Sequence, residues 1–172
     1  AENYALRLIR HAGTDQIEWH VTTGNLRNAQ LEPAFQSAGA HTHRASTGFL
    51  SPRKALTFRR FLRTQRFDAV MSLNGVFCGP AMRLAQMAGV PQRISWHRRS
   101  TPAYRPTLGR RLYAAQALRW TEASSTHILS NSRTALDHFH GPGWAADARF
   151  QVIPNGVDAT RFRRRPDERQ AI

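Results

Sequence analysis

One histidine and several hydroxyl, amide and guanidinium groups of this 172-residue chain directly follow short apolar segments. His97 ends the segment VPQRISWH, and Arg98 and Arg99 come next. A neutral imidazole can act as general base toward a hydroxyl group, while guanidinium groups bind phosphate oxygens in pairs. We expect the positive field of the two arginines to lower the pKa of His97 and keep its ring neutral. His97 is therefore the candidate catalytic residue, and a histidine that is only hydrogen-bonded within a loop is the alternative.

Five other polar residues and one glycine stand in equivalent places after apolar segments. They are Asn74, Ser130, Asn131, Asn155, Gly156 and Asp158. Together with Arg98 and Arg99, these residue types favour a site that binds hydroxyl or phosphate groups. Ordinary capping of the helix that follows is the alternative for the serines of the tripeptide SNS.

The sequence predicts no metal site. His41 and His43, like His138 and His140, are spaced as metal ligands can be, but no cysteine or carboxylate stands at a matching spacing. No Walker loop, GxSxG or complete GxGxxG occurs either.

Apolar segments of strand type alternate with segments of helix type along the chain. The expected strands lie within 17–24, 41–47, 68–73, 90–97, 126–131 and 149–155, and the expected helices within 2–12, 31–40, 51–67, 79–89, 106–125 and 132–140. This alternation predicts an α/β fold, with a doubly wound, Rossmann-like, mostly parallel sheet and helices on both faces. Since ligands bind beyond the carboxyl ends of parallel strands, the candidate residues are expected along one edge of the sheet.

Charge is the strongest bulk feature, because 25 Lys and Arg residues stand against 11 Asp and Glu residues. The net charge of +14 favours anionic partners, although a general arginine enrichment would give the same total. In the helix expected over 52–66, Arg59, Arg60, Arg63 and Arg66 adjoin an apolar side. This basic side could lie on an acidic membrane or simply face solvent. The single cysteine, Cys78, fits a reducing compartment.

The run VIPNGVDATRF, at 152–162, resembles the signature that ends the N-terminal domain of GT-B glycosyltransferases of family 4. AENYALRLI resembles the helix that follows the family's first strand and Gly-Gly loop, so we expect that strand to be missing here. Three further segments, DAVMSLNG, VPQRISWHRRS and ILSNSRTALDHF, resemble family segments in the same order. The resemblance covers almost the whole chain.

This resemblance implies that the chain holds the acceptor and that a second domain, absent here, binds the nucleotide sugar. It places His97 near the acceptor and the transferred sugar, and Glu2, Asn155, Gly156 and Asp158 on the interdomain, donor-facing side. A metal cofactor is usually not required in the family. Ser72 to Asn74 replace the common His-x-His of the family, and the carboxylate-bearing E-x7-E motif is absent, so the chain alone is expected to be inactive.

We therefore expect 1–162 to be the acceptor-side domain of a retaining glycosyltransferase and 163–172 to begin an interdomain linker. The expected partners are a glycan or lipid-linked acceptor of cell-envelope polysaccharide or lipopolysaccharide synthesis, a nucleotide sugar held by the second domain, and an acidic membrane surface. Nucleic acid is not expected as a partner of such an enzyme. The expected location is the cytoplasm, with peripheral contact to the inner membrane face. The alternative is a non-catalytic basic α/β module that binds nucleic acid or anionic surfaces.

Overall fold

The computed structural model describes residues 2–23, 30–48, 51–98 and 107–156. The helices are α1 (Glu2–Ala12), α2 (Glu32–Ser37), α3 (Pro52–Gln65), α4 (Gly79–Ala88), α5 (Leu108–Ser124) and α6 (Arg133–His140), and the 3₁₀ turns are η1 (Gly75–Phe77) and η2 (Pro142–Ala146). The strands are β1 (His20–Thr22), β2 (His41–His43), β3 (Ala69–Ser72), β4 (Gln92–His97), β5 (His127–Ser130) and β6 (Phe150–Val152). Each of these helices and strands overlaps a segment expected from the sequence, and the 3₁₀ turns were not expected.

Local chemistry explains where the helices begin and end. The Ser51 hydroxyl accepts a hydrogen bond from the Lys54 N–H, and Pro52 occupies the first helical position of α3. The Ser132 hydroxyl caps α6 in the same way. Gly89 ends α4 with φ of 85°, a left-handed conformation that glycine adopts without steric cost. α3 instead ends on Arg66 with φ of 53°, an uncommon choice for a residue with a Cβ.

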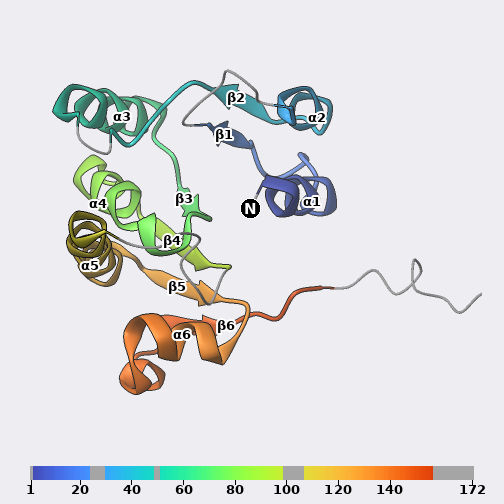
Figure 1. Cartoon of the computed structure of the whole chain (residues 1–172). Coiled ribbons are helices and arrows are strands. Elements are labelled where there is room, and N and C mark those ends of the chain that lie inside the picture. Colours follow the sequence, from blue (N-terminus) through green and yellow to red (C-terminus); the bar gives the residue numbers. More distant parts are fainter. Residues whose placement is uncertain (1, 24–29, 49–50, 99–106, 157–172) are drawn as a thin grey trace, which may run out of the picture.

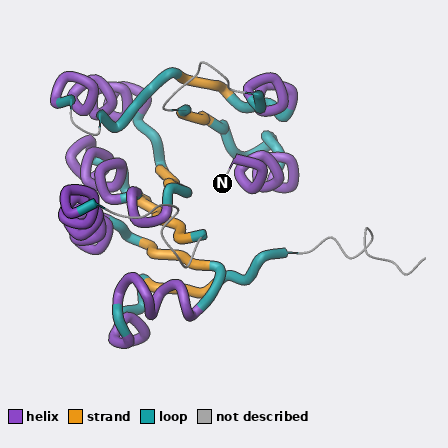
Figure 2. The backbone as a smooth tube through the Cα atoms, viewed as in Figure 1, coloured by secondary structure: helices purple, strands orange, loops and turns teal. Residues whose placement is uncertain are grey.

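The strands form two parallel sheets flanked by helices (Figure 1, Figure 2). One sheet has the order β3-β4-β5-β6, and the other pairs β1 with β2. In the view of Figure 1, α3, α4 and α5 lie to the left of the strands, and α1 and α2 lie to the right. The α/β class and the parallel strands predicted from the sequence are thus confirmed. Among the described residues the strands divide into two sheets, because β1 and β3 exchange no ladder hydrogen bonds.

Separate apolar clusters support the two sheets. Leu6, Ile9, Phe35 and Ala40 join α1 and α2 to one face of the β1–β2 pair. A second cluster, with Phe58, Leu62, Ala85 and Val90, joins α3 to α4 and to the start of β4. The helices cover the sheet faces but leave the strand ends free to carry polar groups. Among the described residues, no helix combines the length and the apolarity that crossing a bilayer would require.

Candidate functional site

The carboxyl ends of the larger sheet bring the predicted residues to one edge. Parallel pairing sets His97 beside Ser130, and Ser130 beside Val152. Asn74 follows β3 by two residues and Asn155 follows β6 by three. The structure therefore confirms that Asn74, His97, Ser130 and Asn155 follow strands that end at the same edge.

His97 is fully buried at this edge. Its ring stacks on Phe139 of α6 with 5.4 Å between ring centroids, and its Nε2 lies 3.3 Å from His140 Nε2. Burial, with a smaller contribution from the neighbouring His140, lowers the pKa of His97 to about 3. The pKa of His97 is lowered, as predicted. The causes are burial of the ring and the neighbouring His140, and not the charge of Arg98.

A chain of hydrogen bonds leads from a carboxylate to His97. Glu122 Oε1 lies 2.6 Å from His140 Nδ1, and His140 Nε2 contacts His97 Nε2. An ionised carboxylate only accepts hydrogen bonds, so this contact places a hydrogen on His140 Nδ1. Burial lowers the pKa of His140, although Glu122 acts in the opposite direction, so the ring is neutral. A neutral ring with its hydrogen on Nδ1 has an acceptor at Nε2. His97 Nε2 then donates to His140.

This assignment leaves a lone pair on His97 Nδ1. That atom is buried and has no hydrogen-bond partner among the described residues. A buried polar atom without a partner costs about 1–3 kcal/mol, so a hydroxyl or a water that reached it would be held firmly. His97 can therefore accept a hydrogen bond or a proton at Nδ1.

Arg98 connects three elements at the same edge. One terminal nitrogen donates to Asn155 Oδ1 at 2.9 Å, and the guanidinium carbon lies 3.7 Å from the centroid of the Tyr4 ring. Tyr4, on α1, also packs edge-on against Trp96. Cation–π and hydrogen-bond contacts fix the guanidinium while its other terminal nitrogen, buried, has no partner in the described part of the chain. A fixed guanidinium with a spare donor suits an anionic or hydroxyl ligand.

The remaining predicted residues differ in burial. Ser130 is fully buried. Its hydroxyl accepts a hydrogen bond from the Ser132 N–H, and this bond stabilises the turn before α6. Asn131 is half-buried. The exposed residues are Glu2, Asn74 and Gly156. Arg99 and Asp158 lie outside the described residues, as does the stretch 163–172 predicted as a linker.

Sequence analysis missed three residues of this site, namely Tyr4, Glu122 and His140. Tyr4 lies on α1, and nothing in the sequence distinguishes it from the other residues of that helix. Glu122 lies near the end of α5, 25 residues after His97. The pair His138 and His140 was considered only as a metal motif. No spacing signal in the sequence identifies these contacts, because they depend on how α5 and α6 pack against β4.

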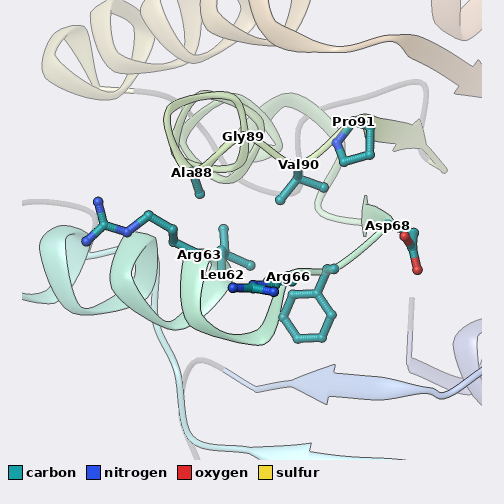
Figure 3. Close-up of a pocket in the computed structure, with 9 residues that line it drawn as sticks. Leu62, Arg63, Arg66, Asp68, Ala88, Gly89, Val90 and Pro91 are labelled. Atoms are coloured by element: carbon teal, nitrogen blue, oxygen red, sulfur yellow. The ribbon is translucent and has the colours of Figure 1, made fainter.

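A pocket of about 330 Å³ lies away from this edge, between the end of α3 and the turn from α4 to β4. Figure 3 shows Leu62 facing Ala88 and Val90 across it, and Arg63 and Arg66 also line it. It adjoins Asp68 and Pro91, which precede β3 and β4, so it lies at the amino edge of the sheet. We do not assign it to the candidate site, because ligands of open parallel sheets bind at the carboxyl edge.

Comparison with known proteins identifies the family. The model of the glycosyl transferase 4-like domain matches residues 1–156. Searches of the curated proteins and of the solved structures gave no match. The matched range holds the whole described edge, from Tyr4 to Asn155, within a parallel α/β fold. The chain therefore belongs to the glycosyl transferase 4-like domain family, and is a domain of a glycosyltransferase.

Proposed function

We propose that this chain is the acceptor-binding half of a retaining glycosyltransferase that moves a sugar from a nucleotide sugar to a glycan or lipid-linked acceptor of the cell envelope. The main support for this proposal is that His97, Arg98 and Asn155 lie together at one edge of the sheet. The chain also belongs to a glycosyltransferase family. Family membership favours this function over a basic module that binds nucleic acid.

His97 would orient the acceptor or the transferred sugar through Nδ1. The Glu122–His140 pair fixes the tautomer of His97, so that Nδ1 presents a lone pair to a sugar hydroxyl. A ring with a pKa of about 3 is a weak base, and hydrogen bonding therefore fits His97 better than proton abstraction. Access to Nδ1 requires the side chains that bury it to move.

Arg98 would bind an anionic or hydroxyl group of a substrate. Asn155 and Tyr4 hold the guanidinium in place, so little side-chain entropy is lost on binding. Asn155, Gly156, Asp158 and Glu2 would face the second domain, which binds the nucleotide sugar. We further propose that this domain is inactive alone, needs no metal for transfer, and works in the cytoplasm at the inner membrane face.

Isothermal titration calorimetry of the chain with UDP-, GDP- and ADP-sugars tests the assignment of the two halves. We expect weak binding or none, because the proposed donor site lies in the second domain. Binding in the low micromolar range would place the donor site in this chain and contradict the proposal.

Kinetics of the enzyme that contains this chain tests the role of His97. We expect His97→Ala to lower kcat/KM by about 10²-fold, while the exposed His138→Ala leaves it unchanged. His97→Asn keeps a hydrogen-bonding group but cannot take a proton, so partial activity supports orientation. Wild-type kcat/KM in His97→Ala would contradict a role at the site.

Nitrogen-15 NMR of the histidine rings tests the hydrogen-bond chain independently of activity. We expect Nδ1 of His97 to show the chemical shift of an unprotonated nitrogen and Nε2 that of a protonated one. Glu122→Gln should disturb this distribution at both His140 and His97. A protonated His97 Nδ1 in the wild-type chain would contradict the tautomer that the contacts assign.

A further inference from the structure

The small sheet carries a cluster of imidazole and carboxylate groups on one face. Side chains alternate between the faces of a strand, so His41 and His43 share one face of β2. Glu18, just before β1, contacts His20 on the same side. Parallel pairing sets His20 beside His41. Trp19 and Val21 take the other face and pack on the cluster of α1 and α2. The histidine face is therefore the one turned away from that apolar core.

Three donor atoms converge on this face. His20 Nε2 lies 3.0 Å from Glu18 Oε1, and His41 Nε2 lies 3.5 Å from the same oxygen. All three ligand atoms lie within 4.8 Å of one another. Bonds of about 2.0–2.2 Å in a tetrahedral zinc shell hold neighbouring donor atoms roughly 3.3 Å apart. An ion could join these groups after only small side-chain shifts.

His20 is held in the orientation that such a ligand needs. Its Nδ1 lies 2.8 Å from His43 Nε2, the two rings stack, and Phe67 packs edge-on against His20. Histidine ligands of metals commonly use their second nitrogen in this way, and the second bond fixes the tautomer that leaves Nε2 free to ligate. The His20 side chain is only 14% exposed, which limits its other rotamers.

The opposite side of the cluster is open to solvent. The side chains of Glu18 and His41 are 73% and 61% exposed, so water can complete the coordination shell. Two imidazoles and one carboxylate are a donor set that suits Zn²⁺ and neighbouring divalent transition metals better than Mg²⁺ or Ca²⁺. Glu18 lies two residues before His20 and reaches His41 across the strand pair, a contact that spacing along the sequence does not show.

We propose that Glu18, His20 and His41 form a binding site for a zinc-class divalent transition metal, which joins β1 to β2. These strands are only three residues long each and form their own sheet. A metal bound to both would strengthen a pairing that few backbone hydrogen bonds support. This site lies on a different sheet from His97, and the inference does not depend on the proposed transfer reaction.

Calorimetric titration of the tag-free, metal-stripped chain with Zn²⁺ tests the proposal. We expect one ion per chain with a dissociation constant in the micromolar range or tighter, and a rise in Tm on binding. His41→Ala and Glu18→Gln should each weaken binding by at least about tenfold. Both side chains are exposed, so neither change should disturb packing, and circular dichroism checks this.

A double variant, His11→Ala with His138→Ala, is the matched control, because both histidines are exposed and lie on other elements. It should bind Zn²⁺ as the wild-type chain does. Co²⁺ gives a second readout, since its visible absorption reports coordination geometry and should change in His41→Ala. Zn²⁺ affinity that is unchanged in both cluster variants, or no binding at millimolar Zn²⁺, would overturn the proposal and leave Glu18 as a hydrogen-bond acceptor for two histidines.

Discussion

At the residue scale, burial determines the chemistry of His97. An imidazole at a strand end would titrate near neutral pH in water, but this ring is enclosed by Phe139 and His140. Desolvation of the charged form exceeds every other influence on its pKa. The residue is therefore a neutral hydrogen-bonding group across the physiological range.

The lowered pKa of His97 predicts acid sensitivity of folding. The ring has a pKa of about 3 in the folded chain and an ordinary value of 6.5 in the unfolded chain, so the unfolded state binds more protons between these values. Its contribution to stability is complete above pH 6.5 and is lost as the pH falls toward 3. Each pH unit in this window costs roughly 1.4 kcal/mol for one such group.

Urea unfolding at about pH 7 and about pH 5 measures this effect. His97→Gln removes the titrating ring and should flatten the pH dependence, while His138→Gln, at an exposed position, should not. His140 is shifted in the same direction, so part of the dependence should remain in His97→Gln. An equal pH dependence in the wild-type chain and His97→Gln would show that His97 is not buried in its neutral form.

At the level of secondary-structure elements, α4 and α5 approach each other closely at Gly79. A Cβ built on Gly79 would lie 1.9 Å from the Ala117 carbonyl oxygen, which is a backbone atom that cannot move alone. We expect Gly79→Ala to force the helices apart and to destabilise the fold by about 1–3 kcal/mol. Gly109, on α5, has no atom within 4 Å of its built Cβ. Gly109→Ala is therefore the control and should be neutral or stabilising by about 0.5–1 kcal/mol in urea unfolding.

The basic side of α3 allows a second test at this scale. Arg60 and Arg63 are exposed, whereas Arg59 donates to the Met87 carbonyl at 3.1 Å and so belongs to the packing of α3 on α4. If the acceptor is lipid-linked, Arg60→Gln with Arg63→Gln should weaken binding to acidic vesicles roughly 30-fold, since each charge contributes about 1 kcal/mol.

Vesicle sedimentation at low and high salt measures this binding. Replacing Arg7 and Arg10 of α1 with glutamine is the control of equal charge, because both are exposed on another helix. A similar loss in both double variants would assign the attraction to the net charge of the whole chain. Equal binding to neutral and acidic vesicles would leave Arg60 and Arg63 as a solvated helix face.

For the molecule as a whole, the two sheets differ in how many neighbouring strands stabilise each strand. β4 and β5 each have strand partners on both sides, while β1 and β2 pair only with each other. Local opening should therefore cost less free energy in the small sheet. We expect amides of β4 and β5 to exchange slowest with deuterium and those of β1 and β2 to exchange faster, as measured by NMR. Equal protection of both sheets would show that they unfold as one cooperative unit.

Features that local chemistry controls could be predicted from the amino-acid sequence. The order and type of the described helices and strands follow from apolar periodicity and from caps such as Ser51 and Ser132. The parallel α/β class follows from their alternation, and the closing run at 152–162 indicated the family that the model match confirms. The edge shared by His97 and Asn155 was predictable too, because parallel strands end on the same side.

The contacts between side chains distant in the sequence depend on the tertiary fold. Glu122 and His140 reach His97 because α5 and α6 pack beside β4, and Glu18 reaches His41 because β1 and β2 pair in register. The division of the described strands into two sheets also depends on which strands exchange hydrogen bonds, and the sequence does not show this. These outcomes depend on long-range packing, and burial beside His140 then lowered the pKa of His97.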